Sequence, residues 1–137
     1  MEHPGVHPIL AVDWGERRIG LAATDELGVA AHGLPTLVRK NRATDLAALD
    51  ALIEQRAIRT LLIGRPLHMD GTAGRSTHLA EQFGRTLAKR SGLPLILRDE
   101  RLTSLEGAAR AGHRGDVDQA AAIVMLEEYM AEPEAAL

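Results

Sequence analysis

Two acidic side chains stand where buried strands are predicted to end, and a charged group at such a position can take part in chemistry. Asp13 follows the apolar run Ile9–Val12, and Glu100 follows the last apolar run of the chain, at residues 93–97. Sites in open α/β sheets form beyond the ends of the strands. We therefore expect both carboxylates to lie at one rim of a sheet, partly shielded from water.

A third carboxylate, Asp118, lies on the buried side of a predicted helix over residues 117–130. Counting back by three and four residues from the apolar stripe, which begins at Ala121 and Ala122, leads to Asp118. Residues at this spacing share a helix face. Asp116 is offset by about 200° around the helix, so we expect it to face elsewhere and to cap the helix.

Three carboxylates brought together in a half-buried site would repel each other, and a divalent cation would remove that repulsion. Carboxylate oxygens suit magnesium and manganese. Two such ions can stabilise the attacking and leaving oxygens of a phosphoryl displacement. Simpler interpretations also exist. Asp13 could be a turn residue, Glu100 could pair with Arg98 or Arg101, and Asp118 could compensate the helix dipole.

The elements that would position these groups follow from apolar periodicity and turn residues. The predicted order is three strands, then helix, strand, helix, strand and two helices. This order indicates an α/β domain in which a three-strand meander leads into a parallel portion, at residues 9–130, with a flexible arm at 1–8 and a frayed acidic tail at 131–137. We predict strands at 9–12, 19–23, 34–38, 60–63 and 93–97 and helices at 41–57, 76–90, from 103 onward and at 117–130.

Composition excludes several classes of site. The net charge is −3, which counts against a strongly basic nucleic-acid coat, and there is no cysteine for a thiolate zinc site. The six histidines show no ligand spacing. The segment 64–74 lacks the Gly-Lys-Ser/Thr ending of a P-loop. No secretory signal or membrane span is visible, so the expected location is the cytoplasm.

Four segments resemble motifs of one family. These are residues 9–15 with 18–20, residues 64–71, the run Asp99–Thr103, and Val117-Asp118 with 120–122. In this order they resemble the YqgF family, described as pre-16S rRNA nucleases and as Holliday-junction-resolvase-like proteins, over residues 9–130. The resemblance implies a ribonuclease H-like fold, a five-stranded mixed sheet flanked by helices, and maturation of the 5′ end of 16S ribosomal RNA.

The resemblance also implies residue roles. Asp13, Glu100 and Asp118 would be the catalytic carboxylates and the ligands of Mg²⁺ or Mn²⁺. Gly15 would let a phosphate approach the backbone. Thr103 would be a substrate ligand or a helix cap. Arg17, Arg18 and Arg101 would contact phosphates or form surface salt bridges.

Two departures from the family pattern concern substrate binding. The segment between Thr103 and Asp118 is shorter and less basic than the family's, and His68 stands where Asn is usual. The expected partner is an RNA precursor within or beside an assembling ribosomal particle, bound by a monomer or a homodimer. The alternatives are cleavage of branched DNA, which would ask for a two-fold dimer, and a non-catalytic RNA-binding assembly factor. At 137 residues the chain has no second lobe for an actin-like ATPase.

Overall fold

The protein folds around one mixed sheet whose strand order is β3-β2-β1-β4-β5. The structure, a computed structural model, describes residues 6–66, 68, 70–99 and 116–131. The strands are β1 (Ile9–Trp14), β2 (Arg18–Thr24), β3 (Ala31–Val38), β4 (Thr60–Arg65) and β5 (Leu95–Asp99), and the helices are α1 (Arg42–Gln55), α2 (Arg75–Ser91) and α4 (Val117–Ala131).

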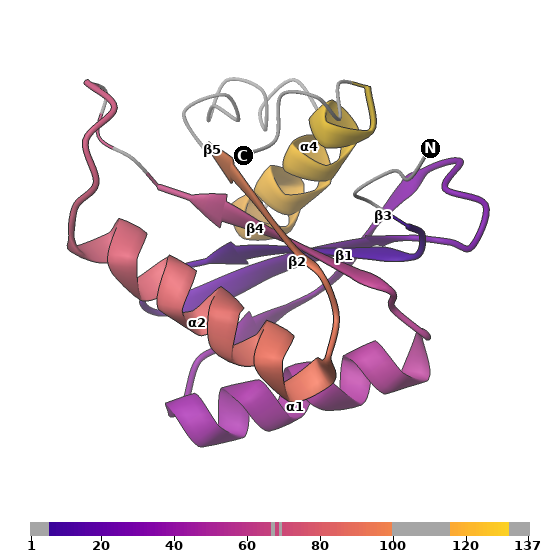
Figure 1. Cartoon of the computed structure of the whole chain (residues 1–137), viewed down its shortest axis with the longest axis horizontal. Coiled ribbons are helices and arrows are strands. Elements are labelled where there is room, and N and C mark those ends of the chain that lie inside the picture. Colours follow the sequence, from indigo (N-terminus) through magenta and orange to yellow (C-terminus); the bar gives the residue numbers. More distant parts are fainter. Residues whose placement is uncertain (1–5, 67, 69, 100–115, 132–137) are drawn as a thin grey trace.

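The sheet combines an antiparallel meander with a parallel portion. β2 pairs antiparallel with both β1 and β3, whereas β4 pairs parallel with β1 and β5. Helices α1 and α2 cover one face of the sheet, and α4 crosses the other (Figure 1). The predicted five-stranded mixed α/β sheet is confirmed. The carboxyl ends of β1, β4 and β5 therefore meet at one edge.

Alternation along β1 explains why its sequence is almost wholly apolar. Leu10, Val12 and Trp14 belong to the core on the α1 and α2 face, while Ile9 and Ala11 belong to the core under α4. A strand buried on both faces has no position that favours a polar residue. Each of its large apolar side chains contributes about 1.5–3 kcal/mol by leaving water. The next position on the α4 face is Asp13.

The helix ends follow the residues that the sequence places there. Asn41 caps α1 by accepting a 2.8 Å hydrogen bond from the Thr44 amide. Gly92 ends α2 with a left-handed φ of 75°, a conformation that favours glycine, as predicted. Asp116 accepts a 2.8 Å hydrogen bond from the Gln119 amide at the start of α4, which confirms its predicted capping role.

Some predicted boundaries were wrong. We predicted that the first strand ends at residue 12 and that Asp13 lies in a turn, but β1 continues because its ladder with β2 extends to Trp14 opposite Ile19. β3 begins three residues earlier than predicted and keeps Pro35 because it lies at the sheet edge. The predicted helix from residue 103 and the tail at 132–137 lie outside the described residues.

Part of the predicted N-terminal arm contacts the sheet. The Val6 amide donates to Thr60 Oγ1 at 3.0 Å, and the Thr60 hydroxyl donates to the Val6 carbonyl at 2.7 Å. His7 Nδ1 lies 2.7 Å from the Thr24 hydroxyl. Residues 6 and 7, just before β1, are therefore held against the ends of β2 and β4. Residues 1–5 lie outside the described part of the chain.

Candidate functional site

Asp13 lies on the α4 face of β1, half-buried, one residue before the strand ends. Its ladder partner on β2 is Gly20. Val12, Ile63 and Leu97 form one row across β1, β4 and β5, because Val12 pairs with Ile63 and Ile63 pairs with Leu97. Asp13 is thus one residue beyond this row, at the edge where the parallel strands end.

Asp118 reaches the same place because α4 begins directly over Gly20. A Cβ atom built on Gly20 would collide with the backbone carbonyl of Asp118, so only glycine permits this approach. Gly33 on β3 makes the same allowance for the side chain of Gln119, whose Nε2 donates to the Leu34 carbonyl at 2.8 Å. Two glycines on neighbouring strands thus admit the first turn of α4. Asp13 and Gly20 face each other, so Asp118 comes close to Asp13.

The Asp118 carboxylate forms an ion pair with Arg18 at the start of β2. The distance from Arg18 Nε to Asp118 Oδ2 is 2.9 Å, and the two side chains are 61% and 34% exposed. An exposed pair of this kind contributes at most about 1 kcal/mol. From the sequence, Arg18 was expected either to contact a phosphate or to form a surface salt bridge, and the structure shows the salt bridge. Because this salt bridge is weak, Arg18 can exchange Asp118 for another partner.

The other predicted site residues, Glu100, Arg101 and Thr103, lie outside the described residues. Within the described part of the chain, no group of three or more His, Asp or Glu side chains converges as a metal site. The described carboxylates at this edge include Asp13 and Asp118, together with Asp99 at the end of β5. Glu100 is the residue that follows β5 in the sequence.

A buried cation, Arg98, lies beside this edge on the α4 face of β5. It is 3% exposed, and its Nη2 lies 3.5 Å from Glu128 of α4. Its Nε and Nη1 have no hydrogen-bond partner among the described residues. Arg98 pairs with Gly64 of β4, one step beyond the Val12 row, so it lies level with Asp13. The sequence predicted Arg98 only as a salt-bridge partner of Glu100 and did not predict its burial.

A second arginine supports Asp13 from the opposite face of the sheet. The Arg39 guanidinium lies 4.9 Å from the Trp14 ring centroid, and its Nε donates to buried Asp45 at 3.1 Å. Asp45 also accepts from the Lys40 amide at 3.1 Å. This cluster fixes the residue next to Asp13. The sequence analysis did not identify it, because residues 14, 39 and 45 share no local motif.

The turn after β1 gives Gly15 a structural role. A Cβ atom on Gly15 would lie 2.6 Å from the Arg18 carbonyl oxygen, so a side chain here would disrupt the turn between β1 and β2. The Gly15 carbonyl also accepts a 3.4 Å hydrogen bond from Arg39. Close approach of a phosphate is therefore not needed to explain glycine at this position.

The loop after β4 is closed by its own hydrogen bonds. Asp70 Oδ1 accepts from the Thr72 amide at 2.9 Å and from the Thr72 hydroxyl at 2.7 Å. These two bonds hold the pKa of the Asp70 carboxyl below its usual value, and the bond from the Thr72 hydroxyl has the larger effect. His68 donates its amide to the Thr72 carbonyl at 2.9 Å. Asp70 is therefore a turn residue in this structure.

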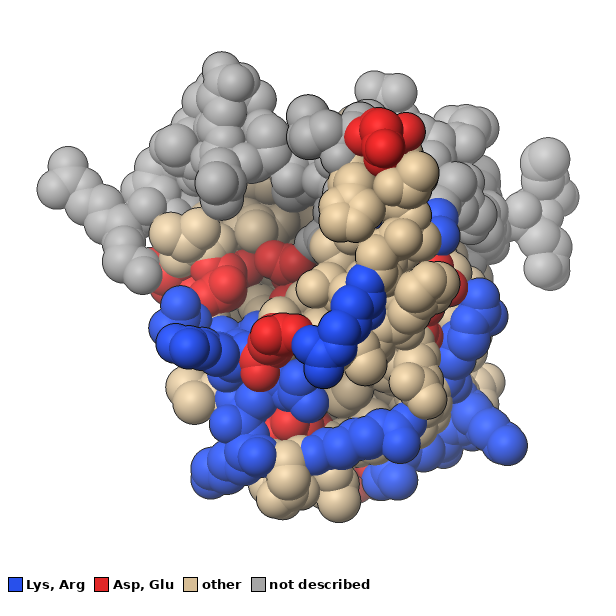
Figure 2. All heavy atoms as spheres, turned by 90° about the vertical axis from the view of Figure 1, so that its left-hand side faces the viewer, with Lys and Arg blue, Asp and Glu red and all other residues tan. Residues whose placement is uncertain are grey.

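Basic side chains gather along one side of the edge where β1, β4 and β5 end. Figure 2 looks onto this edge and shows Lys and Arg gathered over its lower part, on the side of α1 and α2, around several acidic side chains. Arg17, Lys40 and Arg42 are exposed there. Arg75, at the start of α2, pairs with Glu16 at 3.0 Å. The local charge thus suits a polyanion despite the net charge of −3.

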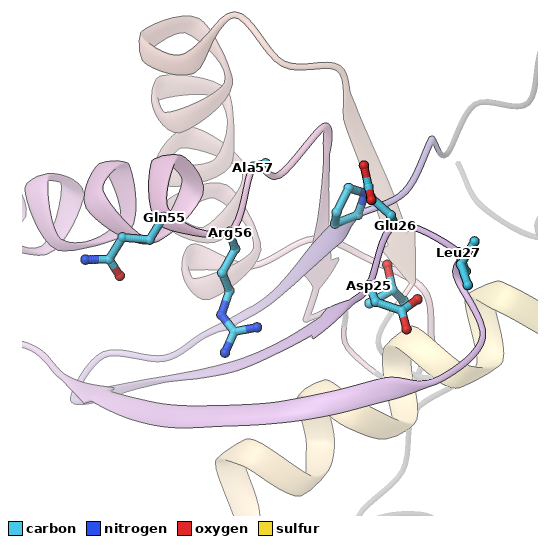
Figure 3. Close-up of a pocket in the computed structure, with 8 residues that line it drawn as sticks. Asp25, Glu26, Leu27, Gln55, Arg56 and Ala57 are labelled. Atoms are coloured by element: carbon cyan, nitrogen blue, oxygen red, sulfur yellow. The ribbon is translucent and has the colours of Figure 1, made fainter.

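A hollow of about 800 Å³ lies at the opposite end of the sheet. Arg56 and Ala57, which precede β4, lie on one side, and Asp25 and Glu26, in the turn after β2, lie across the opening from them (Figure 3). Pro8, which precedes β1, also lines the hollow. Sites in parallel sheets form at the carboxyl ends of strands, so this hollow is separate from the candidate site.

No helix in the described part of the chain is long and apolar enough to cross a bilayer.

Comparison with known proteins agrees with this architecture. A solved RuvC from T. thermophilus in complex with a Holliday junction superposes with a TM-score of 0.61 at 14% identity, covering 93% of this chain and 96% of that one. The expected ribonuclease H-like fold is thereby confirmed.

Curated relatives show the family. A protein of Koribacter versatilis is 44% identical over 89% of this chain and 85% of its own length, and one of Synechococcus elongatus is 37% identical over 90% and 88%. Both carry the name "Putative pre-16S rRNA nuclease". The family model described as "RuvX: Holliday junction resolvase" matches residues 7–132. These descriptions confirm the predicted class, a nuclease that hydrolyses ester bonds, and the chain belongs to the RuvX family.

Proposed function

We propose that this chain is a metal-dependent nuclease that matures the 5′ end of a 16S ribosomal RNA precursor in the cytoplasm. The observation that carries the proposal is the approach of α4 to Gly20, which brings Asp118 beside Asp13 at the edge where the parallel strands end. The names of the curated relatives support the RNA substrate. In this proposal Asp13, Glu100 and Asp118 are the catalytic carboxylates.

The donor chemistry fits a hard divalent cation. Carboxylate oxygens are the ligands that magnesium and manganese prefer, and Asp13 is half-buried on a rigid strand. Ile96 and Arg98 both lie on the α4 face of β5. Glu100 stands two residues further along the sequence, and it completes the ligand set in this proposal. A bound divalent ion would supply a deprotonated water and charge stabilisation for the leaving oxygen.

The side chains around the carboxylates have separate roles in this proposal. Asp13, Glu100 and Asp118 hold the ion and orient the attacking water. Arg18 compensates Asp118 when the ion is absent and can turn to a substrate phosphate when the ion binds, because its exposed salt bridge is weak. Arg17 lies exposed in the same turn, where it can contact a neighbouring phosphate.

Cleavage of a Holliday junction is the second candidate, and the family description supports it. A four-way junction has two-fold symmetry, so its paired cleavage asks for a two-fold dimer. A protein that elutes as a monomer and cuts the RNA precursor, with no cut in a four-way junction, would exclude this candidate.

The test is cleavage of a labelled 16S precursor with Mg²⁺ or Mn²⁺ by the intact protein and by Asp13→Asn, Glu100→Gln and Asp118→Asn. Asp25→Asn is the control, since Asp25 lies at the opposite end of the sheet. We expect losses of about 10²–10³-fold in each of the three site variants, as for other charge-stabilising groups, and no loss in the control. Cleavage that survives all three substitutions would exclude this site. RNA binding without cleavage by the intact protein would instead favour an assembly factor.

The same variants test ion binding without turnover. A ligand that binds only the folded state raises the unfolding free energy by RT ln(1 + [L]/Kd). We expect Mn²⁺ to raise the melting temperature of the intact protein and of Asp25→Asn, and to have a smaller effect on Asp13→Asn and Asp118→Asn. Equal shifts in all four proteins would place the ion elsewhere.

A further inference from the structure

We propose that one exposed face of α2 binds the backbone of the RNA strand that leads away from the site. This inference rests on the proposed function. The face, called here the α2 stripe, consists of Arg75, His78, Gln82, Arg85 and Lys89, all of which are exposed.

The spacing of the stripe places its members on one side of the helix. Successive members are three or four residues apart, so at about 100° per residue they fall within about 80° of each other. The buried residues of α2, among them Ala80, Phe83 and Leu87, lie on the opposite side, against the sheet. The stripe therefore faces outward along the whole helix.

A hollow runs along the stripe. It has a volume of about 310 Å³ and is lined by His78, Glu81, Gln82, Arg85, Thr86 and Lys89. The one acid in this lining, Glu81, is paired with Arg65 and lies 3.7 Å from Arg85. Arg42 of α1 donates to the Thr86 hydroxyl at 2.7 Å, which adds another cation beside the stripe.

The helix that carries the stripe is cationic although the whole chain is not. α2 holds four Lys and Arg against one Glu, whereas the whole chain has a net charge of −3. Charge of one sign gathered on one segment attracts a partner of the opposite sign. The repeated anion that such a stripe fits is the phosphate backbone of a nucleic acid.

The stripe begins at the candidate site. Its first member, Arg75, pairs with Glu16 at 3.0 Å, and Glu16 is three residues beyond Asp13. α2 follows β4, which ends at the same edge as β1. An RNA strand cut at the carboxylates, on the α4 face, would therefore turn around this edge of the sheet to reach α2.

The length of the stripe sets the length of RNA that it can hold. Fourteen residues separate Arg75 from Lys89, which is about 21 Å along a helix. At about 3.4 Å per nucleotide of a stacked strand, this corresponds to about six nucleotides. We expect tight binding to need this much RNA on one side of the cleaved bond.

The test compares Arg85→Gln/Lys89→Gln with Arg56→Gln/Arg59→Gln, each also carrying Asp13→Asn so that bound RNA is not cut. Arg56 and Arg59 are exposed cations at the opposite end of the sheet. RNA affinity is measured against salt concentration. Removing two phosphate contacts to a single strand should lower the salt slope by about 1.4 and weaken binding at 0.1 M salt by about tenfold or more. The control pair should leave both unchanged.

Cleavage by the versions that retain Asp13 separates this inference from the proposed function. We expect the stripe variant to cut a long precursor less well and to cut RNA that ends within two nucleotides of the cleaved bond as well as the intact protein does. Unchanged salt slope and unchanged cleavage of the long precursor would overturn the stripe and leave the nuclease standing. A change seen only with DNA, or only in the oligomeric state, would also overturn it. An intact protein that neither binds nor cuts RNA would overturn both proposals.

Discussion

The backbone of Asp118 occupies the space that a side chain on Gly20 would fill. Gly20 is also the ladder partner of Asp13. One glycine therefore sets the distance between a strand that carries the first carboxylate and a helix that carries the last. The candidate site depends on this contact more than on any hydrogen bond that we observe near it.

We expect Gly20→Ala to damage the site more than the fold. The added methyl group would push α4 away from β2, because the neighbouring atoms belong to backbone that cannot rotate aside. Overpacking of this kind costs about 1–3 kcal/mol of unfolding free energy. Urea denaturation measures that loss, and we expect cleavage to fall at least tenfold under conditions where the variant is still folded.

Gly84→Ala is the matched control for this change. A Cβ on Gly84 would lie 2.8 Å from the Ile63 side chain, on the sheet face away from α4. We expect a similar loss of stability with little loss of cleavage. Equal losses of cleavage in the two variants would show that general destabilisation, and not the position of Asp118, explains the effect of Gly20→Ala.

Replacing Arg98 with methionine tests whether its buried charge acts on the carboxylates. Two guanidinium nitrogens of Arg98 lack partners among the described residues, and its ion-pair partner Glu128 is 34% exposed. We therefore expect Arg98→Met to leave the free energy of unfolding unchanged or to raise it, as measured by urea denaturation. Two strand spacings separate Arg98 from Asp13, about 10 Å. At an effective dielectric constant near 20, two unit charges at this distance interact by about 1.7 kcal/mol, and the Arg98 charge would repel a divalent ion near Asp13 about twice as strongly. Glu128 offsets part of this repulsion. We therefore expect Arg98→Met to bind Mn²⁺ at least about tenfold more tightly, and unchanged affinity would contradict this.

The pKa of Asp70 tests the loop after β4. Hydrogen bonds from the Thr72 hydroxyl and amide favour the ionised carboxylate and hold its pKa below the usual value. Thr72→Val removes the hydroxyl donor, so we expect the pKa of Asp70 to rise toward that of an ordinary aspartate. Carboxyl-carbon NMR during an acid titration measures this directly. The unsubstituted protein, titrated in parallel, is the control.

Asp45→Ala tests the support behind Trp14. Asp45 is 1% exposed and is the ion-pair partner of Arg39, whose side chain is 20% exposed. Removal of a buried carboxylate leaves the arginine unpaired, and we expect a loss of about 2–4 kcal/mol of unfolding free energy. Trp14 is the single tryptophan, so its fluorescence reports the change locally. Asp50→Ala, which breaks a more exposed pair with Arg90, should cost at most about 1 kcal/mol.

The sequence was sufficient to predict the sheet and two of the three carboxylate positions. Apolar runs of four or five residues mark strands buried on both faces, which is why β1 and β4 were recognised. The helical spacing between Asp118 and Ala121 was enough to place Asp118 on the sheet side of α4, because a helix face follows from spacing alone. The role of Glu100 stays a prediction.

Other parts of the site could not be predicted because they depend on contacts between distant segments. Nothing near Arg98 in the sequence indicates that its guanidinium is buried under α4. Arg39 packs on Trp14 only because β3 ends beside the β1–β2 turn. The strand end at Trp14 was missed because register with β2, and not the composition of β1, decides where the ladder stops.

The ion pair between Arg18 and Asp118 joins residues that are one hundred positions apart. A chain that is stalled or cut before residue 117 keeps Asp13 and most of the sheet but has no α4 to place beside it. Such a fragment would also leave Ile9, Ala11 and Leu62 uncovered, because α4 supplies the other half of that core. Under the proposed function, cutting activity would therefore arise only after the last helix has been made and has packed onto the sheet.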